Sequence, residues 1–285
     1  MTANIFPYDI LGNIALVKFP KETKTGKKKK FAASILKKSK SIKTVLEKTK
    51  GFKGRLRKQE TRWIAGEKTK EAIYRENNCV FRFNVDSTYF SPRLSNERKE
   101  IAGKIKKGQE VLVMFAGVAP FSIAIARNSQ AARIYSNEIN REANKYGEMN
   151  IILNKVKNKI VMLDGDVKKI AKKIAKGEFD VNAKNSHGLK SGFGYDAAVP
   201  AKFDVIVMPR PQLKETFLKQ AFMLSKKGTQ IFYYDFCKED EINNVVAKIN
   251  AEAKKAGKKI KISRVKKAGE IAAYRYRVRV DFSVL

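Results

Sequence analysis

The chain has 285 residues, 43% of them apolar, and carries 61 Lys and Arg against 28 Asp and Glu. No apolar run approaches the roughly 18 residues of a membrane span, and two distant cysteines with one histidine exclude the usual zinc site. We therefore expect two compact domains in a cytoplasmic monomer without metal, since no signal peptide is visible either. The net charge of +33 favours an acidic polymer, first of all a nucleic acid, as the partner, although lysine enrichment also occurs through genome composition or a hot habitat.

Between residues 18 and 58 the chain carries 17 Lys and Arg against two acids. The densest run is made of Lys27, Lys28, Lys29 and Lys30. We expect this run in a solvated loop between a strand over 13–19 and a helix over 31–38, and a further strand over 79–85. These patterns predict a small, basic α+β domain over residues 1–88, which binds RNA through the lysine run.

Strands and helices alternate in the rest of the chain, which is typical of an α/β domain. The expected strands are 111–115, 134–137, 160–163, 203–208 and 230–234. The expected helices are 121–127, 141–153, 213–224 and 239–256. Two final strands, 259–265 and 274–284, are expected to form a hairpin, so residues 89–285 should fold as a doubly wound sheet with a closing antiparallel hairpin. The stretch 177–201, rich in Gly, Asn and Ser, is expected to be a surface loop in which His187 is dispensable.

In an open α/β sheet, ligands bind beyond the carboxyl ends of the strands, where the strand order reverses. The first strand ends in a turn of small residues, 115–120, and Glu138 ends the second strand about 20 residues later, where an acid binds ribose hydroxyls. Asp166 follows the third strand and can accept from an adenine amino group, and residues 208–211 would wall the pocket. The turn lacks the G-x-G-x-x-G pattern that contacts pyrophosphate, so a nucleoside such as S-adenosylmethionine is favoured over NAD.

A more specific pattern is carried by the segments 89–98, 114–123, 134–140, 150–156 and 165–166. Together they resemble the tRNA guanine-N1 methyltransferase family, which modifies the base 3′ of the anticodon, and its wybutosine-pathway relatives. The resemblance covers nearly the whole chain. It implies a class I, Rossmann-like methyltransferase domain after the small domain, S-adenosylmethionine as the cofactor, and the anticodon stem-loop of tRNA as the substrate.

The resemblance also implies cofactor contacts for individual residues. Arg98 would face the methionine carboxylate. Glu138 with Ile139 would bind the ribose. Asp166 with Val167 would bind the adenine. Further contacts are expected from the turn and from the end of the fourth strand, at Phe115, Ala116, Gly117, Val118, Pro120 and Met208.

For catalysis, the resemblance implies that Arg93 approaches the target guanine, where a guanidinium stabilises negative charge on the base oxygen as the N1 proton leaves. Glu97 is the candidate for the general base, because Glu138 and Asp166 are expected to bind the cofactor. Arg210 is expected to contact the RNA together with Arg93. We expect a loop base to flip into the pocket between the two domains and to take the methyl group directly.

Three departures from the family pattern bear on the reaction: Val113 replaces Asp, Ala119 replaces Gly, and Met208-Pro-Arg210 replaces Asn-Leu-Pro. The change to Val113 removes an acid that would lie behind the cofactor. The change to Met208 removes an amide that would contact substrate or cofactor. Two other functions therefore stay open. A relative that transfers the aminocarboxypropyl group of the same cofactor would share the fold, and a non-catalytic RNA-binding protein would keep the charge but lose cofactor affinity.

Overall fold

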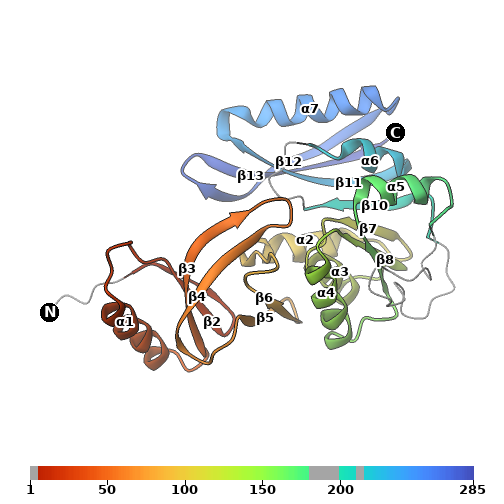
Figure 1. The fold of residues 1–285 in the computed structure, drawn as a ribbon. Coiled ribbons are helices and arrows are strands. Elements are labelled where there is room, and N and C mark those ends of the chain that lie inside the picture. Colours follow the sequence, from red (N-terminus) through yellow and green to blue (C-terminus); the bar gives the residue numbers. More distant parts are fainter. Residues whose placement is uncertain (1–5, 180–198, 210–214) are drawn as a thin grey trace.

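The computed structural model describes residues 6–179, 199–209 and 215–285, in which helices flank a large sheet and a smaller sheet lies beside it (Figure 1). The strands of the large sheet are β7 (Glu110–Met114), β8 (Arg133–Glu138), β9 (Ile160–Asp164), β10 (Phe203–Met208), β11 (Ser225–Lys238), β12 (Ile260–Ala272) and β13 (Arg275–Val284). Their order is β12-β13-β11-β10-β7-β8-β9, with parallel pairing from β9 to β11 and antiparallel pairing of β13 with β11 and β12. The predicted doubly wound sheet with a closing antiparallel hairpin is confirmed.

Both faces of the large sheet are buried, which explains why its central strands are continuous apolar runs. The covering helices are α2 (Ser95–Lys104), α3 (Pro120–Asn128), α4 (Arg141–Leu153), α5 (Val167–Ala175), α6 (Leu218–Met223) and α7 (Ile242–Lys255). In β7, Val111 and Val113 join the core that contains α2, α3 and α4, whereas Leu112 and Met114 join the core that contains α5, α6 and α7. Two short 3-10 helices, η1 (Pro92–Leu94) and η2 (Glu239–Glu241), precede α2 and α7.

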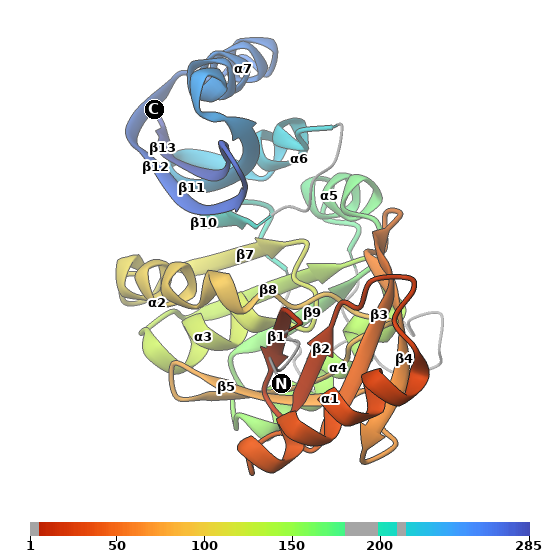
Figure 2. The same ribbon diagram turned by 90° about the vertical axis from the view of Figure 1, so that its left-hand side faces the viewer.

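The small sheet has the order β1-β2-β3-β4 and carries one helix on its outer face (Figure 2). Its strands are β1 (Tyr8–Leu11), β2 (Ile14–Val17), β3 (Thr44–Lys53) and β4 (Lys58–Gly66). Helix α1 (Thr25–Lys38) connects the parallel strands β2 and β3, and its Ala32 and Ile35 pack with Val17, Val45 and Ile64 of the sheet. This is the small α+β unit expected at the N-terminal end.

The lysine run over 27–30 lies in α1 and not in the loop that the sequence predicted. Lysine is a good helix former, and a helix turns some residues of any such run toward its sheet. Lys28 is turned inward, where its ammonium is buried and pairs with Glu47 of β3 at 2.7 Å. Lys28 is therefore not available to RNA, whereas Lys27, Lys29 and Lys30 are exposed.

A separate hairpin of β5 (Glu71–Glu76) and β6 (Cys79–Asn84) lies between the two sheets in the sequence. Asn150 of α4 and Asn154, which caps its C-terminal end, bind the β6 backbone. The Asn154 amide exchanges two hydrogen bonds with Val80 at 2.8 and 2.6 Å, and the Asn150 amide does the same with Arg82 at 2.7 and 3.0 Å. These contacts fasten the hairpin to the large domain, although the Ile73 amide of β5 also donates to Asn13, beside β2, at 2.7 Å. We propose a domain boundary over residues 67–70 as an alternative to the one expected at residue 88.

Candidate functional site

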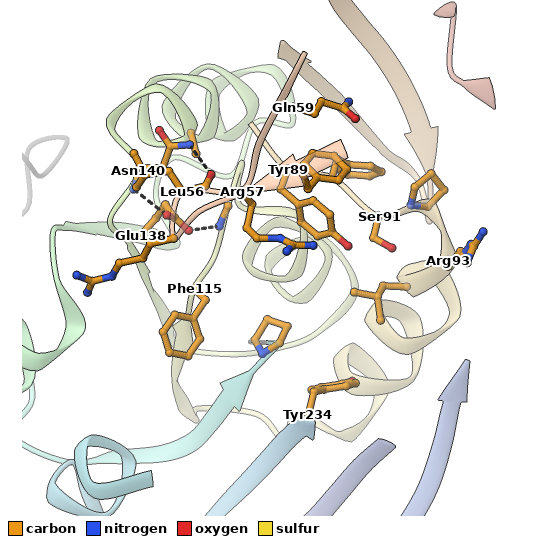
Figure 3. Close-up of a pocket in the computed structure, with 18 of the residues that line it drawn as sticks. Leu56, Arg57, Gln59, Tyr89, Ser91, Arg93, Phe115, Glu138, Asn140 and Tyr234 are labelled. Carbon is orange, nitrogen blue, oxygen red and sulfur yellow. Dashed lines mark hydrogen bonds between the residues drawn. The ribbon is translucent and has the colours of Figure 1, made fainter. Parts of the chain in front are cut away.

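A pocket of about 530 Å³ lies between the small sheet and the carboxyl ends of β7, β8 and β10 (Figure 3). Strand β7 has β10 on one side and β8 on the other, so the strand order reverses here, where doubly wound sheets bind ligands. The tip of the β3–β4 hairpin reaches this edge. The Asn140 amide donates to the Leu56 carbonyl at 3.3 Å, and Arg55 pairs with Asp166 at 2.8 Å. Both parts of the chain therefore build the pocket.

Glu138 is held in a cradle of backbone amides at the end of β8. One carboxylate oxygen accepts from the Gly117 amide at 2.7 Å, and the other accepts from the Ile139 and Asn140 amides at 2.8 and 2.7 Å. Burial raises the pKa of this carboxyl, and the three amides offset part of that rise. Because its position is fixed and it lines the pocket, the carboxylate suits the role of acceptor for ribose hydroxyls.

The turn after β7 is tightly folded beside Glu138. Its residues Phe115, Gly117 and Ala119 have left-handed backbone conformations, with φ of 58°, 58° and 64°. A Cβ atom at Gly117 would lie 3.3 Å from the Tyr89 carbonyl oxygen, so glycine lets the two segments approach. Phe115 and Gly117 line the pocket. The other predicted turn residues are buried and do not line it: Ala116, Val118 and Pro120.

Replacing Ala119 by Gly is expected to raise the free energy of unfolding by up to about 1 kcal/mol. The left-handed conformation costs a residue with a Cβ about 1 to 2 kcal/mol, and the greater freedom of glycine in the unfolded chain offsets part of the gain. Urea unfolding measures the difference. Ala124→Gly in the middle of α3, the helix that Ala119 precedes, is the control and should lower stability. A loss of stability in Ala119→Gly would contradict the strain at this position.

An apolar slot lies beside Glu138. The rings of Phe115 and Phe217 meet edge to face, with their centroids 5.0 Å apart. The rest of the slot is lined by Gly165, Val167 and Pro209. These flat and apolar surfaces suit a purine ring. Met208, which the sequence placed at the cofactor, is fully buried behind this wall and does not line the pocket.

Asp166 does not line the pocket but caps the N-terminus of α5. Its carboxylate accepts from the Lys168 amide at 2.9 Å and from the Arg55 guanidinium at 2.8 Å. Burial alone would raise the pKa of this carboxyl, but the two donors lower it below its usual value. Contact with adenine stays a prediction for Asp166, and its observed partner is the tip of the β3–β4 hairpin.

Arg98 lies elsewhere than the resemblance implied. Its side chain is 1% exposed, pairs with both carboxylate oxygens of Glu76 and donates to the Ser91 carbonyl at 3.0 Å. It does not line the pocket. Arg98 therefore fixes the segment that carries Arg93, and its guanidinium is not directed at a cofactor carboxylate.

Glu97, the predicted general base, lies behind the pocket wall. Its carboxylate accepts from the Tyr234 hydroxyl at 2.9 Å, from Lys266 at 2.7 Å and from Arg279 at 2.6 Å. Burial would raise the pKa of Glu97, but these three donors bring it below the usual value. Tyr234 lines the pocket whereas Glu97 does not, so Glu97 is linked to the pocket through this hydroxyl.

Two arginines lie in the part of the pocket away from the cradle. Arg93 lies in η1 at the edge of the pocket, on the side opposite Glu138, and Arg57 lies near the middle (Figure 3). The sequence did not single out Arg57. Its guanidinium is 5.6 Å from the Phe52 ring and 5.4 Å from the Tyr89 ring, and its buried Nε has no hydrogen-bond partner among the described residues. Arg57 lines the pocket, so its guanidinium is placed to meet a ligand there.

Two predictions fall on residues that the structure does not describe: the RNA contact of Arg210 and the surface loop that holds His187. Within residues 6–179, 199–209 and 215–285, no group of three or more His, Cys, Asp or Glu side chains could hold a metal ion. In the same residues no helix is long and apolar enough to cross a membrane.

Residues 72–182 match the TRM5/TYW2 methyltransferase domain, and residues 6–69 match the TYW2 N-terminal domain. The gap between the two matches falls at the boundary that the hairpin contacts favour. Over 310 residues the chain is 34% identical to the tRNA (guanine(37)-N(1))/4-demethylwyosine(37)-methyltransferase Taw22 of Nanoarchaeum equitans, covering 98% of this chain and 99% of that protein.

Two solved structures are similar over 98% of this chain. One is Trm5b from Pyrococcus abyssi, with 33% identity, a TM-score of 0.78 and 74% of its chain covered. The other is the complex of aTrm5 and tRNALeu, with 26% identity, a TM-score of 0.76 and 72% of its chain covered. With a relative at this identity matched along almost its full length, the chain belongs to the TRM5/TYW2 methyltransferase family.

Proposed function

We propose that this chain transfers a methyl group from S-adenosylmethionine to N1 of the guanine 3′ of the anticodon in tRNA. The observation that carries the proposal is a single pocket with a ribose cradle at Glu138 and the guanidinium of Arg57 near two aromatic rings. One region suits the nucleoside of a cofactor and the other suits a base. The names of the similar proteins support the reaction and the substrate. We place the reaction in the cytoplasm, with the chain acting as a monomer.

The cofactor would lie along the edge formed by β7, β8 and β10. Glu138 would accept from its ribose, and the slot between Phe115 and Phe217 would hold its adenine. Gly117 allows the backbone to approach the methionine portion. When bound, S-adenosylmethionine would supply the methyl group on its sulfonium sulfur, and the rest of the cofactor would leave as a neutral thioether.

The guanine would enter beside Phe52 and Tyr89, whose rings provide stacking surfaces for a flipped base. Loss of the N1 proton places negative charge on the base oxygen, and the guanidinium of Arg57, which lines the pocket, can donate to it. Glu97 remains our candidate for the proton acceptor. The proton would pass to the Tyr234 hydroxyl, which gives its own proton to Glu97.

The proposal is tested with two tRNA transcripts that differ only in carrying guanine or adenine 3′ of the anticodon. Labelled methyl groups should be incorporated into the first transcript and not into the second. Equal incorporation into both would overturn the assigned target, and binding of both without incorporation would favour a non-catalytic RNA-binding protein.

Replacing Glu138 by Ala is expected to weaken S-adenosylmethionine binding by about 1.5 to 3 kcal/mol, the range for a hydrogen bond to a charged group. The reason is the loss of the only carboxylate among the described pocket residues near the β7 turn. Calorimetry on the folded variant measures the effect. Glu142→Ala, at a half-buried position in the next helix that does not line the pocket, is the control. Unchanged affinity in Glu138→Ala would remove this residue from the site.

A second candidate is transfer of the aminocarboxypropyl group of the same cofactor. The observation that favours it is the match of residues 6–69 to the TYW2 N-terminal domain. Both reactions would use the same cradle, so the structure of the transferred group separates them.

A further inference from the structure

Three arginines of the described residues are buried, and one of them differs from the others. Arg98 pairs with Glu76, and Arg279 pairs with Glu97, Glu100 and Asp281. Arg277 is 6% exposed, yet no carboxylate of the described residues lies within ion-pair distance of it. Burying a guanidinium without a counter-charge costs several kcal/mol, so an anion from outside the chain is the partner to look for.

Arg277 lines the same pocket as Arg93. It lies in β13, with its guanidinium 5.2 Å from the Phe236 ring. Burial lowers the pKa of Arg277, the Tyr89 and Tyr234 hydroxyls counteract this, and the positive charge of Arg93 adds to the lowering. Two like charges in one pocket are both stabilised when an anion lies between them.

We propose that Arg277 and Arg93 bind one phosphodiester group of the RNA, next to the nucleotide whose base enters the pocket. The inference rests on the proposed function for its substrate. A guanidinium presents a planar fork of donors that matches two phosphate oxygens. The C-terminal hairpin of β12 and β13 would thereby act as part of the RNA-binding surface, although sequence analysis assigned that task to the N-terminal lysines.

A phosphate is favoured over the carboxylate of the cofactor because of where Arg93 lies. Arg93 is at the edge of the pocket, opposite Glu138, where the ribose of the cofactor would bind (Figure 3). An RNA strand that delivers one base into a pocket runs along its edge. A cofactor held at Glu138 lies deeper, against the ends of the strands.

The test compares Arg277→Gln with Arg275→Gln, which removes the same charge from an exposed position of the same strand. For Arg277→Gln, we expect the affinity for a tRNA transcript to fall roughly tenfold or more. The slope of log affinity against log salt should be shallower by about 0.7 than in the wild type, which corresponds to one contact with single-stranded RNA. Affinity for S-adenosylmethionine should stay within about twofold, and Arg275→Gln should change these values little.

Thermal unfolding separates a ligand role from a structural one. Removing an unpaired buried charge should leave the melting temperature of Arg277→Gln equal to that of the wild type or higher.

A transcript with neutral methylphosphonate linkages on both sides of the target guanosine should bind the wild type and Arg277→Gln equally.

Several results would overturn the inference. Equal losses in the two variants would mean that Arg277 contributes only general charge. A loss of cofactor affinity alone would assign Arg277 to the methionine carboxylate. If Arg277→Gln binds tRNA as tightly as the wild type does, and the wild type methylates that tRNA, the inference fails while the proposed function stands. A wild type that binds no tRNA would overturn both.

Discussion

Replacing Arg57 by Ala will slow methyl transfer in a single turnover by about 10²- to 10³-fold, the usual effect of removing one preorganised donor from developing charge. Arg57 lines the pocket near its middle, so its guanidinium is placed to donate to the base oxygen (Figure 3). The backbone at this position has φ of 52°, and Ala carries the same strain as Arg there. The rate loss will therefore report the guanidinium and not the turn.

Two variants sharpen this experiment. Arg57→Lys keeps the charge but loses the planar fork, so its rate should lie between those of the wild type and Arg57→Ala. Lys58→Ala, at the next and exposed position, should transfer at the wild-type rate. S-adenosylmethionine affinity should be nearly constant throughout. A wild-type rate in Arg57→Ala would remove Arg57 from the reaction and leave Arg93 as the candidate.

Replacing Arg279 by Met will lower the free energy of unfolding by about 3 to 5 kcal/mol, the range for removing one partner of a buried ion pair. Arg279 is fully buried and bridges Glu97 and Glu100 of α2 to Asp281 of its own strand, at 2.5 to 2.6 Å. Met has a similar length, so the loss will come from three carboxylates that share one cation fewer, with Lys266 left beside Glu97 and Glu100. Urea unfolding measures it, and a loss below about 1 kcal/mol would contradict the bridging role of Arg279.

The same bridge predicts a dependence on acid. The hydrogen bond from Arg279 lowers the pKa of Glu100 to about 2, with Lys266 helping and burial opposing. A carboxyl whose pKa is lowered by folding stabilises the protein above its unfolded pKa, and that stability is lost as the pH falls from about 4.5 toward 2. The wild type should therefore lose more stability over this range than Arg279→Met does. Equal losses in the two proteins would contradict the coupling.

The sequence predicted the large domain well because both faces of its sheet are buried. Strand β10 and helix α4 have the predicted bounds, 203–208 and 141–153. The α4 start is also marked by its cap, since the Asn140 side chain accepts from the Glu142 amide. Strands β3 and β4 were missed because much of each strand is exposed and charged, so the apolar alternation is broken. Helix α5 was missed despite its apolar face.

The site was predictable only where its residues follow strand ends. Glu138 and the turn at Gly117 follow β8 and β7, so their position along the chain identifies them. Arg57 is one of 17 basic residues over 18–58, and only the folded hairpin brings it to the pocket. Arg98 belongs to a family motif, but its partner Glu76 lies in another element, so no sequence pattern indicated their ion pair.

The identity of the transferred group and its position on the RNA test the proposed function most directly. The chain would be incubated with S-adenosylmethionine and unmodified tRNA, the tRNA digested, and the modified nucleoside identified by mass and by the fragment that contains it. We predict N1-methylguanosine, formed only in the fragment that carries the base 3′ of the anticodon. A nucleoside bearing an aminocarboxypropyl group, or no modified nucleoside although cofactor and tRNA both bind, would contradict the proposed function.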